Sequence, residues 1–469
     1  MKRFTNACVL FMNKFLPDAF IFAVILTIIV FVAAMPAAGA GPLQMSMAWG
    51  KGAWGLLAFS MQMALVVVTG TAFATAPVIK RSLESIANLA KTPAQGVMLT
   101  VLVGAVATFI NWGFGLIVGA LFGRAVARKL QGVDYRMLIA AGYSGFAIWH
   151  AGISGSIPLS LNTAGNLKPE GMLNTGGAVK ELIGTGDTIF APWNLIMVAA
   201  CTLLTTIIFG MAHPKPEDTF VADPKLLEDK EREYPKPVTP AEKIENSPWL
   251  TYFICAAGLT YLIVLFFVKV EVNGATWGKG LKGLDLNSVN FLFLILGMLL
   301  HGTPIRYVHA VMDAAKGAAG VILQFPFYAG IQAMMIYAGG STGTSLAAVI
   351  SNFFVEISNT ITFPIFCFLA AGIVNFFVPS GGGQWAVQGP IMMPAGVELG
   401  VKPAITGMAI AWGDQWTNMI QPFWALPALG AAGLGAKDIM GYCVLALLVM
   451  GVVGVVGFGV IGALGISAL

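Results

Sequence analysis

Two ionisable residues, Asp414 and His150, stand in long apolar stretches where a charge is costly. Asp414 is the only charged residue in Ala404–Leu429, and His150 lies deep in Met137–Gly165. If these stretches lie in a membrane, the default interpretation of such a carboxylate is a functional one. Asp414 could take up a proton, because low-dielectric surroundings disfavour a bare carboxylate. For His150, an ordinary hydrogen-bonded core histidine is as good an explanation as a functional role.

The same region offers a second chemistry, the binding of Na⁺ by hard oxygen ligands. Asp414, Thr417, Asn418 and main-chain carbonyls of an interrupted helix could coordinate that ion. The candidate ion-coupling residues are therefore Asp414, Thr417 and His150, with H⁺ and Na⁺ both open. No other cofactor and no bound metal are expected, since the five scattered cysteines have neither the spacing of a metal site nor that of a disulfide framework.

Two short sequences, "NWGFG" (Asn111–Gly115) and "PSGGGQ" (Pro379–Gln384), should break a helix within apolar surroundings. Glycine there would let bare N–H groups approach a ligand at the positive end of the following helix. Neither sequence contains Lys or Arg, which suits one carboxylate; the alternative is that the glycines only allow close helix packing. The candidate ligand-binding residues are Asn111, Trp112, Gly113, Gly115, Ser154, Ser156, Asn162, Thr163, Ser380, Gly381, Gly382, Gly383, Gln384 and Asn418. The aromatic residues expected to wall an apolar pocket beside them are Trp112, Phe114, Trp385 and Trp416.

The composition is that of a membrane protein. Hydrophobic residues make up 57% and charged residues 10% of the 469 residues, against about 45–50% and about 25% in soluble domains. The net charge of +4 does not indicate nucleic acid, because the basic residues lie in short loops. The stretches long enough to cross a bilayer, which takes about 20 apolar residues, include Ala19–Gly39, Gly55–Ala76, Ile189–Met211, Trp249–Val268 and Ile439–Gly462. We therefore predict an all-α polytopic protein embedded in a lipid bilayer.

A charged, proline-rich segment, residues 213–247, divides the chain into 1–212 and 248–469. It holds six Lys or Arg, nine Asp or Glu and six prolines, which is typical of a solvated cytoplasmic linker without chemistry. The two parts look alike when the second is moved back by 264 residues, which places Asn375 on Asn111 and Asp414 on His150. We predict a first membrane repeat in 1–212 and, in 248–469, a linking span followed by a second repeat.

Basic residues predict that the two repeats have opposite orientations. Clusters in 80–91 and 124–136 should both face the cytoplasm, so the chain between them enters and leaves by one face. In the second half the equivalent stretches have no Lys or Arg, and the basic residues lie in 301–316 instead. We predict two inverted-topology repeats, a pattern typical of secondary transporters. Each has a re-entrant hairpin (about 93–128 and 362–397) and a broken transmembrane helix (about 137–165 and 404–429).

Five motifs carry a resemblance to a known family. They are "INWGFGLIVGALFGRAVAR" (110–128), "LLAFSMQMALVVVTG" (56–70), "QFPFYAGIQ" (324–332), "NFFVPSGGGQWAVQGP" (375–390) and "QPFWALPALGAAGLGAKDIMGYC" (421–443). They look like the bacterial short-chain fatty acid uptake family, which includes the acetoacetate/butyrate carriers of the ion-transporter superfamily. The similarity covers essentially the whole chain.

The resemblance implies a carrier of small monocarboxylates such as butyrate or acetoacetate in the bacterial cytoplasmic (inner) membrane. The superfamily implies an elevator-type transport domain that moves against a scaffold, in a homodimer. Uptake of an anion against a negative interior needs an accompanying cation. A proton is slightly favoured, because a short-chain acid and its proton can move together as a neutral pair.

Two alternatives stay open. A dicarboxylate or citrate carrier of the same superfamily would share this layout, although the lack of cationic residues at both tips argues against a doubly charged substrate. An intramembrane serine hydrolase would use Ser154 in Gly152-Ile153-Ser154-Gly155, near His150. A four-residue match in a chain with 56 glycines is weak evidence, so we expect no enzyme activity.

Overall fold

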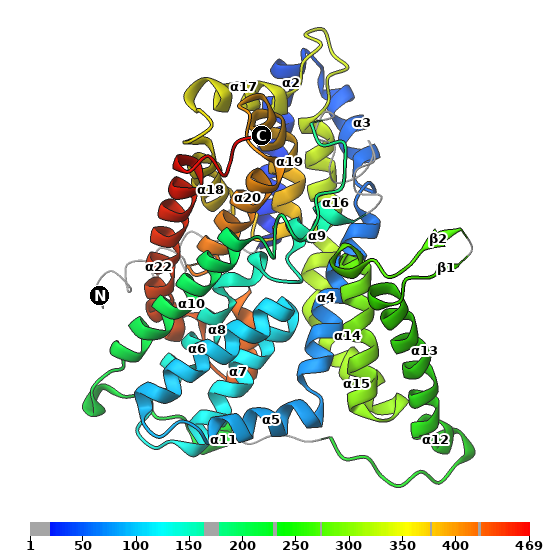
Figure 1. The fold of residues 1–469 in the computed structure, drawn as a ribbon, viewed down its shortest axis with the longest axis vertical. Helices are drawn as coiled ribbons and strands as arrows, with labels where there is room; N and C mark the ends of the chain where they lie inside the picture. Colours follow the sequence, from blue (N-terminus) through cyan, green and yellow to red (C-terminus); the bar gives the residue numbers. More distant parts are fainter. Residues whose placement is uncertain (1–18, 164–177, 228–231, 273, 376–377, 421–423) are drawn as a thin grey trace.

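The computed structural model describes residues 19–469 apart from 164–177, 228–231, 273, 376–377 and 421–423. Parts of the predicted second hairpin and of both predicted broken helices therefore lie outside the described residues. The described chain is helical, with one short β-hairpin as its exception (Figure 1). The predicted all-α class is confirmed.

The elements follow in chain order. The first half contains α2 (Ala19–Ala38), α3 (Pro42–Gly52), α4 (Leu57–Ala74), α5 (Pro77–Ala87), α6 (Pro93–Ile110), α7 (Trp112–Lys129), α8 (Tyr135–Gly145), the 3₁₀ helix η1 (Phe146–Ala151), α9 (Ser156–Asn162) and α10 (Pro192–Met211). The connecting segment contains η2 (Pro216–Asp218), α11 (Pro224–Leu227) and α12 (Pro240–Glu245). The second half contains α13 (Pro248–Phe267), β1 (Glu271–Val272), β2 (Ala275–Thr276), η3 (Gly280–Gly283), α14 (Leu286–His301), α15 (Pro304–Ala315), η4 (Lys316–Ala318), α16 (Ala319–Met335), α17 (Leu346–Ile357), α18 (Phe363–Asn375), α19 (Gly381–Glu398), α20 (Pro403–Thr417), α21 (Ala425–Ala432) and α22 (Ala436–Ala463).

Several helices are suited to a bilayer by length and composition. Within the described residues, six segments are long and apolar enough to cross a membrane: Leu57–Ala74, Pro93–Ile110, Pro192–Met211, Pro240–Phe267, Pro304–Met335 and Ala436–Ala463. On α13, Trp249 and Phe253 are 78% and 75% exposed, as side chains that face lipid are. The chain is a multi-pass membrane protein.

Two groups of helices lie side by side (Figure 1). One consists of α2, α3, α4 and α13 to α16, and the other of α6 to α10 and α18 to α22. The groups meet where α4 packs on α7 and α16 packs on α19. Below, they are called the first and the second group.

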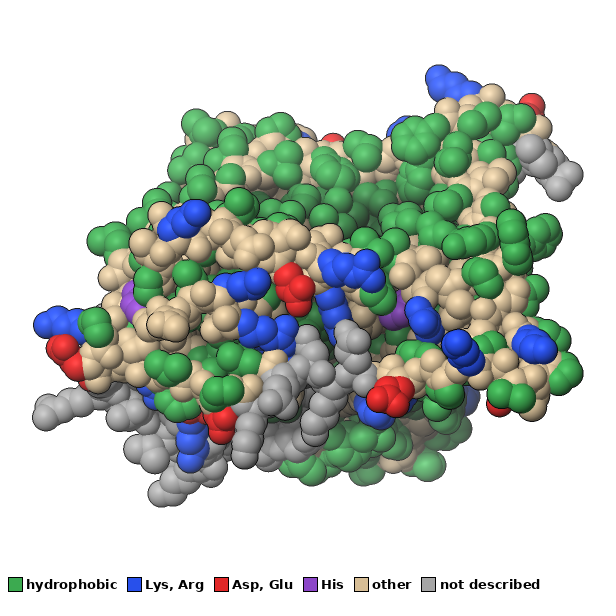
Figure 2. All heavy atoms as spheres, turned by 90° about the horizontal axis from the view of Figure 1, so that it is seen from below, with side chains coloured by type: hydrophobic (Ala, Val, Ile, Leu, Met, Phe, Trp, Pro, Cys, Tyr) green, Lys and Arg blue, Asp and Glu red, His purple; other side chains and the backbone are tan. Residues whose placement is uncertain are grey.

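Basic side chains gather at the lower end of Figure 1, which Figure 2 shows face on. Arg128 at the end of α7 pairs there with Glu84 of α5 at 3.6 Å. From the second half, Asp313 of α15 pairs with Arg232 of the connecting segment at 3.7 Å. The positive-inside rule predicts that this end faces the cytoplasm.

The connecting segment 213–247 binds to both halves of the chain. Its Phe220 N–H donates to Oδ2 of the buried Asp134, at the start of α8, at 2.8 Å. Further along, the guanidinium of Arg306 on α15 lies 5.1 Å from the centre of the Tyr234 ring. The predicted linker is thus docked along part of its described length.

The predicted helix-breaking sequences coincide with helix ends. Asn111 ends α6 and caps α7, because its Oδ1 accepts a hydrogen bond from Phe114 N–H at 2.9 Å. Ser380 caps α19 in the same way, by accepting from Gly383 N–H at 3.4 Å. α7 packs back on α6 and α19 on α18, so each pair forms a helical hairpin.

Glycine allows the first hairpin to touch α8 backbone to backbone. A Cβ at Gly142 would lie 2.4 Å from the carbonyl oxygen of Gly119, and one at Gly119 would lie 2.6 Å from that of Gly142. On α6, a Cβ at Gly104 would lie 2.8 Å from the same Gly142 oxygen. Small residues allow such close approach between membrane helices, and here they fix α6 and α7 against the helix that leads into η1.

Replacing Gly142 with alanine should force these helices apart. We expect Gly142→Ala to lower the free energy of unfolding by about 1–3 kcal/mol, the usual cost of overpacking, and to lower the melting temperature of the purified protein in detergent. Gly50→Ala is the control, because a Cβ there would meet nothing within 4 Å. Equal melting temperatures for the two variants would contradict a tight α7–α8 contact.

Candidate functional site

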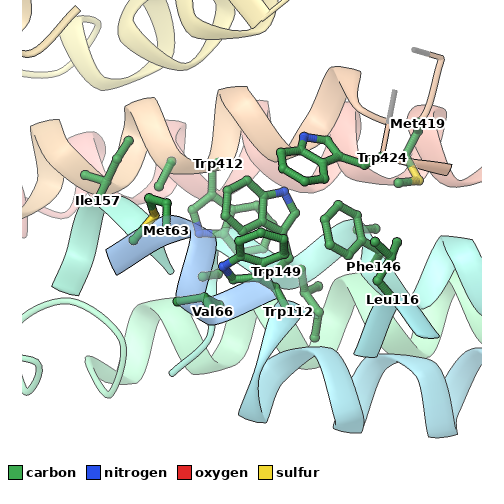
Figure 3. Packing of buried hydrophobic residues seen from close by; sticks show 14 of the residues in the cluster. Met63, Val66, Trp112, Leu116, Phe146, Trp149, Ile157, Trp412, Met419 and Trp424 are labelled. Atoms are coloured by element: carbon green, nitrogen blue, oxygen red, sulfur yellow. The ribbon is translucent and has the colours of Figure 1, made fainter. Parts of the chain in front are cut away.

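Trp149 and His150, at the end of η1, lie where the helix breaks meet. The ring of Trp112, at the tip of the first hairpin, is 5.6 Å from that of Trp149 between centroids. A Cβ at Gly381, the first residue of α19, would lie 2.5 Å from both Trp149 Cη2 and His150 Cε1. Trp149 Nε1 donates to Asn418 Oδ1, at the end of α20, at 2.8 Å. Figure 3 shows the surrounding aromatic cluster, formed by Trp112, Phe146, Trp149 and Trp424.

The two ionisable residues singled out by the sequence form one pair. His150 Nδ1 lies 2.8 Å from Asp414 Oδ2, and both side chains are fully buried. His150 Nε2 accepts a hydrogen bond from Ile157 N–H at 3.0 Å, so this nitrogen carries no proton. A neutral imidazole then has its hydrogen on Nδ1 and donates it to the carboxylate. Asp414 Oδ1 has no hydrogen-bond partner among the described residues, so a proton or cation could bind there.

A second set of hydrogen bonds joins the end of α18 to the end of α20. Asn375 Nδ2 donates to Thr417 Oγ1 at 2.8 Å, and that hydroxyl donates to Gly372 O at 2.8 Å. Asn418 Nδ2 donates to Asn375 Oδ1 at 3.3 Å, and Tyr143 OH donates to Asn418 O at 2.8 Å. The oxygens of Thr417 and Asn418 therefore accept hydrogen bonds from other parts of the protein.

Side-chain amides also bind the main chain where η1 ends. Gln415 Oε1 accepts from His150 N–H at 2.9 Å and from Ala151 N–H at 3.2 Å. Asn194 of α10 donates to Ala151 O at 3.1 Å and accepts from Trp412 Nε1 at 2.9 Å. Backbone groups freed by a helix break need such partners in a water-free interior.

The tip of the first hairpin carries hydrogen-bond donors without partners. Asn111 Nδ2 and Trp112 Nε1 are buried and unpaired within the described part of the chain. The N–H of Gly113, in the first turn of α7, has no partner there either. Trp112 N–H donates to Ser154 Oγ at 2.8 Å, which ties the tip to the break before α9. Unpaired donors at the positive end of a helix favour an anion.

The three glycines of the second tip, Gly381, Gly382 and Gly383, are closely packed in the first turn of α19. A Cβ at Gly382 would lie 2.2 Å from Phe59 Cε1 of α4. One at Gly383 would lie 2.5 Å from Tyr328 Cδ2 of α16. Close packing is thus one reason for glycine at these positions. The N–H groups of Gly381 and Gly382 have no partners among the described residues, so a ligand-binding role stays a prediction.

Three predicted ligand-binding residues lie on α9 or directly after it, and they bind neighbours away from Trp149 and His150. Ser156 Oγ donates to the sulfur of Met63 at 3.2 Å. Asn162 Nδ2 donates to Leu284 O at 3.0 Å, and Thr163 Oγ1 donates to a carbonyl of its own helix. The structure thus places Asn162 and Thr163 at the far end of α9, where they contact the chain that leads into α14.

Gly115 and Gln384 hold the limbs of their hairpins together. A Cβ at Gly115 would lie 2.3 Å from Thr108 Cα of the facing limb. Gln384 Nε2 donates to Ala371 O of α18 at 2.9 Å. Gly115 and Gln384 therefore contact the facing limb of their own hairpin, whereas Asn111 and Trp112 lie at the tip of the first hairpin.

Of the aromatic residues predicted to wall an apolar pocket, some lie at the helix breaks and others pack elsewhere. Trp112 belongs to the cluster at the helix breaks. Trp416 instead stacks on Phe368 at 4.9 Å between centroids, and Phe114 packs on Phe73 at 5.0 Å. Trp385 is fully buried on α19, and its Nε1 has no partner in the described chain.

The sequence reasoning did not single out Trp149, Asn375, Gln415 or Asn194. Two of them carried a signal: Trp149 precedes His150, and the shift of 264 residues places Asn375 on Asn111. Gln415 and Asn194 carried none, because a lone side-chain amide in a helix does not indicate which main-chain group it will bind.

The arrangement does not support a serine nucleophile. Ser154 Oγ is bound to Trp112 N–H, and both ring nitrogens of His150 are engaged, with Asp414 and with Ile157 N–H. A hydrolytic serine needs a base within hydrogen-bond reach.

Comparison with known proteins agrees with this assessment. The family model described as "Short chain fatty acid transporter" matches residues 1–461. A protein of Escherichia coli (strain K12) is 46% identical over 446 residues, which cover 94% of this chain and 96% of that protein. One of Haemophilus influenzae (strain ATCC 51907 / DSM 11121 / KW20 / Rd) is 44% identical over 441 residues, or 93% and 95%. Both are named, provisionally, as short-chain fatty acid transporters.

The fold is similar to that of a solved transporter. The crystal structure of YdaH from Alcanivorax borkumensis matches with a TM-score of 0.60 and 15% identity, over 96% of this chain and 98% of that one. At this identity the likeness concerns the fold alone. The match over nearly the whole sequence carries the assignment: the chain belongs to the short-chain fatty acid transporter family and is a transporter, not an enzyme.

Proposed function

We propose that this protein carries short-chain monocarboxylates, such as butyrate or acetoacetate, inward across the bacterial cytoplasmic (inner) membrane together with a cation. The observation that carries the proposal is the set of unpaired donors at the first hairpin tip, beside an aromatic cluster and without Lys or Arg. An anion with one charge and a short apolar tail is complementary to such a place.

In this proposal Asn111 Nδ2, Trp112 Nε1 and the N–H of Gly113 bind the carboxylate. The rings of Phe146 and Trp424, which lie within 6.5 Å of Trp112 between centroids, would contact the alkyl tail. Neutral donors and a helix dipole suit a single negative charge. A dicarboxylate or citrate would bury a further carboxylate without a cationic partner, at a high cost in free energy.

A proton fits the surroundings of Asp414 better than Na⁺ does. Thr417 Oγ1 and Asn418 Oδ1 already accept hydrogen bonds, from Asn375 and Trp149. Of the carboxylate, hydroxyl and amide oxygens of Asp414, Thr417 and Asn418, only Asp414 Oδ1 is unpaired within the described residues. Hard cations such as Ca²⁺ and Mg²⁺ take about six oxygen ligands, whereas a proton needs one.

The proposal includes inverted repeats and an elevator-type movement. Each half supplies a hairpin and a broken helix, and His150 and Asp414, which are 264 residues apart, bind each other. The second group of helices would move as the transport domain along α4 and α16 of the first group, the scaffold. We also propose a homodimer, in which two scaffolds pair.

Asn111→Asp tests the carboxylate site. Asp keeps an oxygen that can cap α7 but replaces the Nδ2 donor with a second oxygen and adds a negative charge. We expect the half-saturating concentration of butyrate uptake to rise about tenfold or more, because a hydrogen bond to a charged group is worth about 1.5–3 kcal/mol. Uptake of radiolabelled butyrate into proteoliposomes measures it.

Asn359→Asp is the matched control. Asn359 is exposed, and its Oδ1 also accepts from main-chain N–H groups, those of Ile361 and Thr362. It should leave the half-saturating concentration unchanged. An unchanged value for Asn111→Asp as well would move the carboxylate elsewhere.

The aromatic pocket should discriminate weakly between neighbouring chain lengths. Each buried CH₂ contributes about 0.8 kcal/mol, so competition by acetate, propionate, butyrate and valerate should change by a few-fold per carbon. Complete exclusion of both acetate and hexanoate, with butyrate taken up, would indicate a rigid pocket instead.

Asp414→Asn tests the coupling. Asn can still accept a hydrogen bond from His150 but cannot take up a proton. Under an imposed pH gradient, proteoliposomes with this variant should not accumulate butyrate, while exchange of internal for external butyrate persists. Asp438→Asn, at a helix cap of α22, should accumulate normally. Full accumulation by Asp414→Asn under both a pH and a Na⁺ gradient would remove Asp414 from the mechanism, and wild-type accumulation driven only by Na⁺ would select that ion.

A further inference from the structure

Both ring nitrogens of His150 have fixed partners. Nε2 accepts from Ile157 N–H at 3.0 Å, and Nδ1 lies 2.8 Å from Asp414 Oδ2. The ring is stacked on Trp149 at 4.1 Å between centroids, and Gly381 fills the space beside Cε1. A flip of the ring would break both hydrogen bonds, because it exchanges each nitrogen with a carbon.

A second proton on the His150 ring is opposed by its surroundings. It would have to bind Nε2, where it would face the N–H of Ile157 and leave that donor without an acceptor. Ile157 lies in the first turn of α9, so its N–H cannot turn away unless the helix start unwinds. Asp414 Oδ1, in contrast, is buried and unpaired in the described chain and can accept a proton without displacing a partner.

We propose, on the basis of the proton coupling proposed above, that His150 is a positioning residue and not the proton carrier. Its Nδ1–H holds Asp414 Oδ2, so that Oδ1 is the one atom that takes up the coupling proton and later releases it. Ile157 N–H selects the ring nitrogen that keeps its hydrogen. A residue at the helix break of the first half, His150, thus orients the carboxylate of Asp414 in the second half.

Among the described residues, few neighbouring groups could share the proton. α20 supplies Asp414, and α8 supplies Tyr143, whose OH donates to Asn418 O. α22 supplies Cys443, which lies beside Tyr143. Phenols and thiols keep their protons near neutral pH. From α9 and α19, the described contacts of the ring are with Ile157 N–H and Gly381, which do not titrate.

Two substitutions separate a positioning role from proton transfer. His150→Asn places an amide nitrogen near the position of Nδ1, so it keeps a donor for Asp414 but cannot titrate. His150→Gln extends toward the position of Nε2 and leaves Asp414 without that donor. Butyrate uptake and proton influx are measured together in proteoliposomes with an internal pH dye, which gives the number of protons carried per butyrate.

We expect His150→Asn to keep the wild-type number of protons per butyrate, with an uptake rate within about fivefold of wild type, the factor expected for one lost neutral hydrogen bond. His150→Gln should lose most of the accumulation driven by a pH gradient. Because its carboxylate lacks the donor, the pH of half-maximal exchange should move upward by about one unit.

Three other outcomes would contradict these proposals. Loss of proton influx in His150→Asn, with butyrate exchange retained, would make His150 the carrier and overturn this proposal. Identical behaviour of the two variants would show that the donor to Asp414 is unimportant and would overturn it as well. Uptake by the wild type without proton influx would instead overturn the coupling proposed above, and this inference with it.

A measurement on the wild-type protein decides the case if a variant does not reach the membrane. The chain has four histidines, and ¹⁵N-labelled histidine in lipid bilayers reports the hydrogen on each ring nitrogen by NMR. We expect the ring assigned to His150 to stay neutral with its hydrogen on Nδ1 throughout the pH range in which transport declines. Residue-specific assignment is needed, because His213 Nε2 also accepts from a main-chain N–H, that of Asp134, and its Nδ1 lies 2.8 Å from Pro214 O. A doubly protonated ring at this position in that range would overturn the proposal.

Discussion

A break in a membrane helix frees main-chain groups that no lipid can satisfy, and the rest of this structure depends on how those groups are bound. Here the partners come largely from the other half of the chain. Gln415 accepts from the N–H groups of His150 and Ala151, and Tyr143 donates to Asn418 O. In the described part of the chain, neither broken helix is satisfied by its own residues alone, so the two broken helices lie against each other. The binding of substrate and ion at that place, as proposed above, would be a consequence of this requirement.

The donors and the acceptor left unpaired by this arrangement belong to different elements. The first hairpin tip presents Asn111 Nδ2 and Trp112 Nε1, whereas α20 presents Asp414 Oδ1. In the proposed mechanism, an anion and a proton carried together would add no net charge, which avoids the cost of moving a charge against the membrane potential. The absence of Lys and Arg from both tips fits this division, because a fixed cation would compete with the proton for the carboxylate.

Glycines allow close contacts both within the second group of helices and at its boundary with the first. Gly119 and Gly142 join helices within the second group, so they contribute to its rigidity. Gly382 and Gly383 face Phe59 and Tyr328 of the first group, across the boundary along which the groups would slide. Contacts with the rims of aromatic rings are replaceable during such a movement, whereas the hydrogen bond from Ser156 Oγ to the sulfur of Met63, which also crosses the boundary, would have to break.

The sequence by itself determined the properties that depend on neighbours along the chain. Apolar runs marked the membrane helices, and the capping residues Asn111 and Ser380 marked where the hairpins turn. An isolated carboxylate marked Asp414. Only the tertiary structure decided which groups meet. Ser154 and Asn162 are both polar residues of one broken segment, yet α9 carries Asn162 away to Leu284 while Ser154 binds the Trp112 N–H. The physical reason is that a hydrogen bond depends on a few ångströms in space, and the path of the chain through the second group of helices brings residues 264 positions apart within that distance.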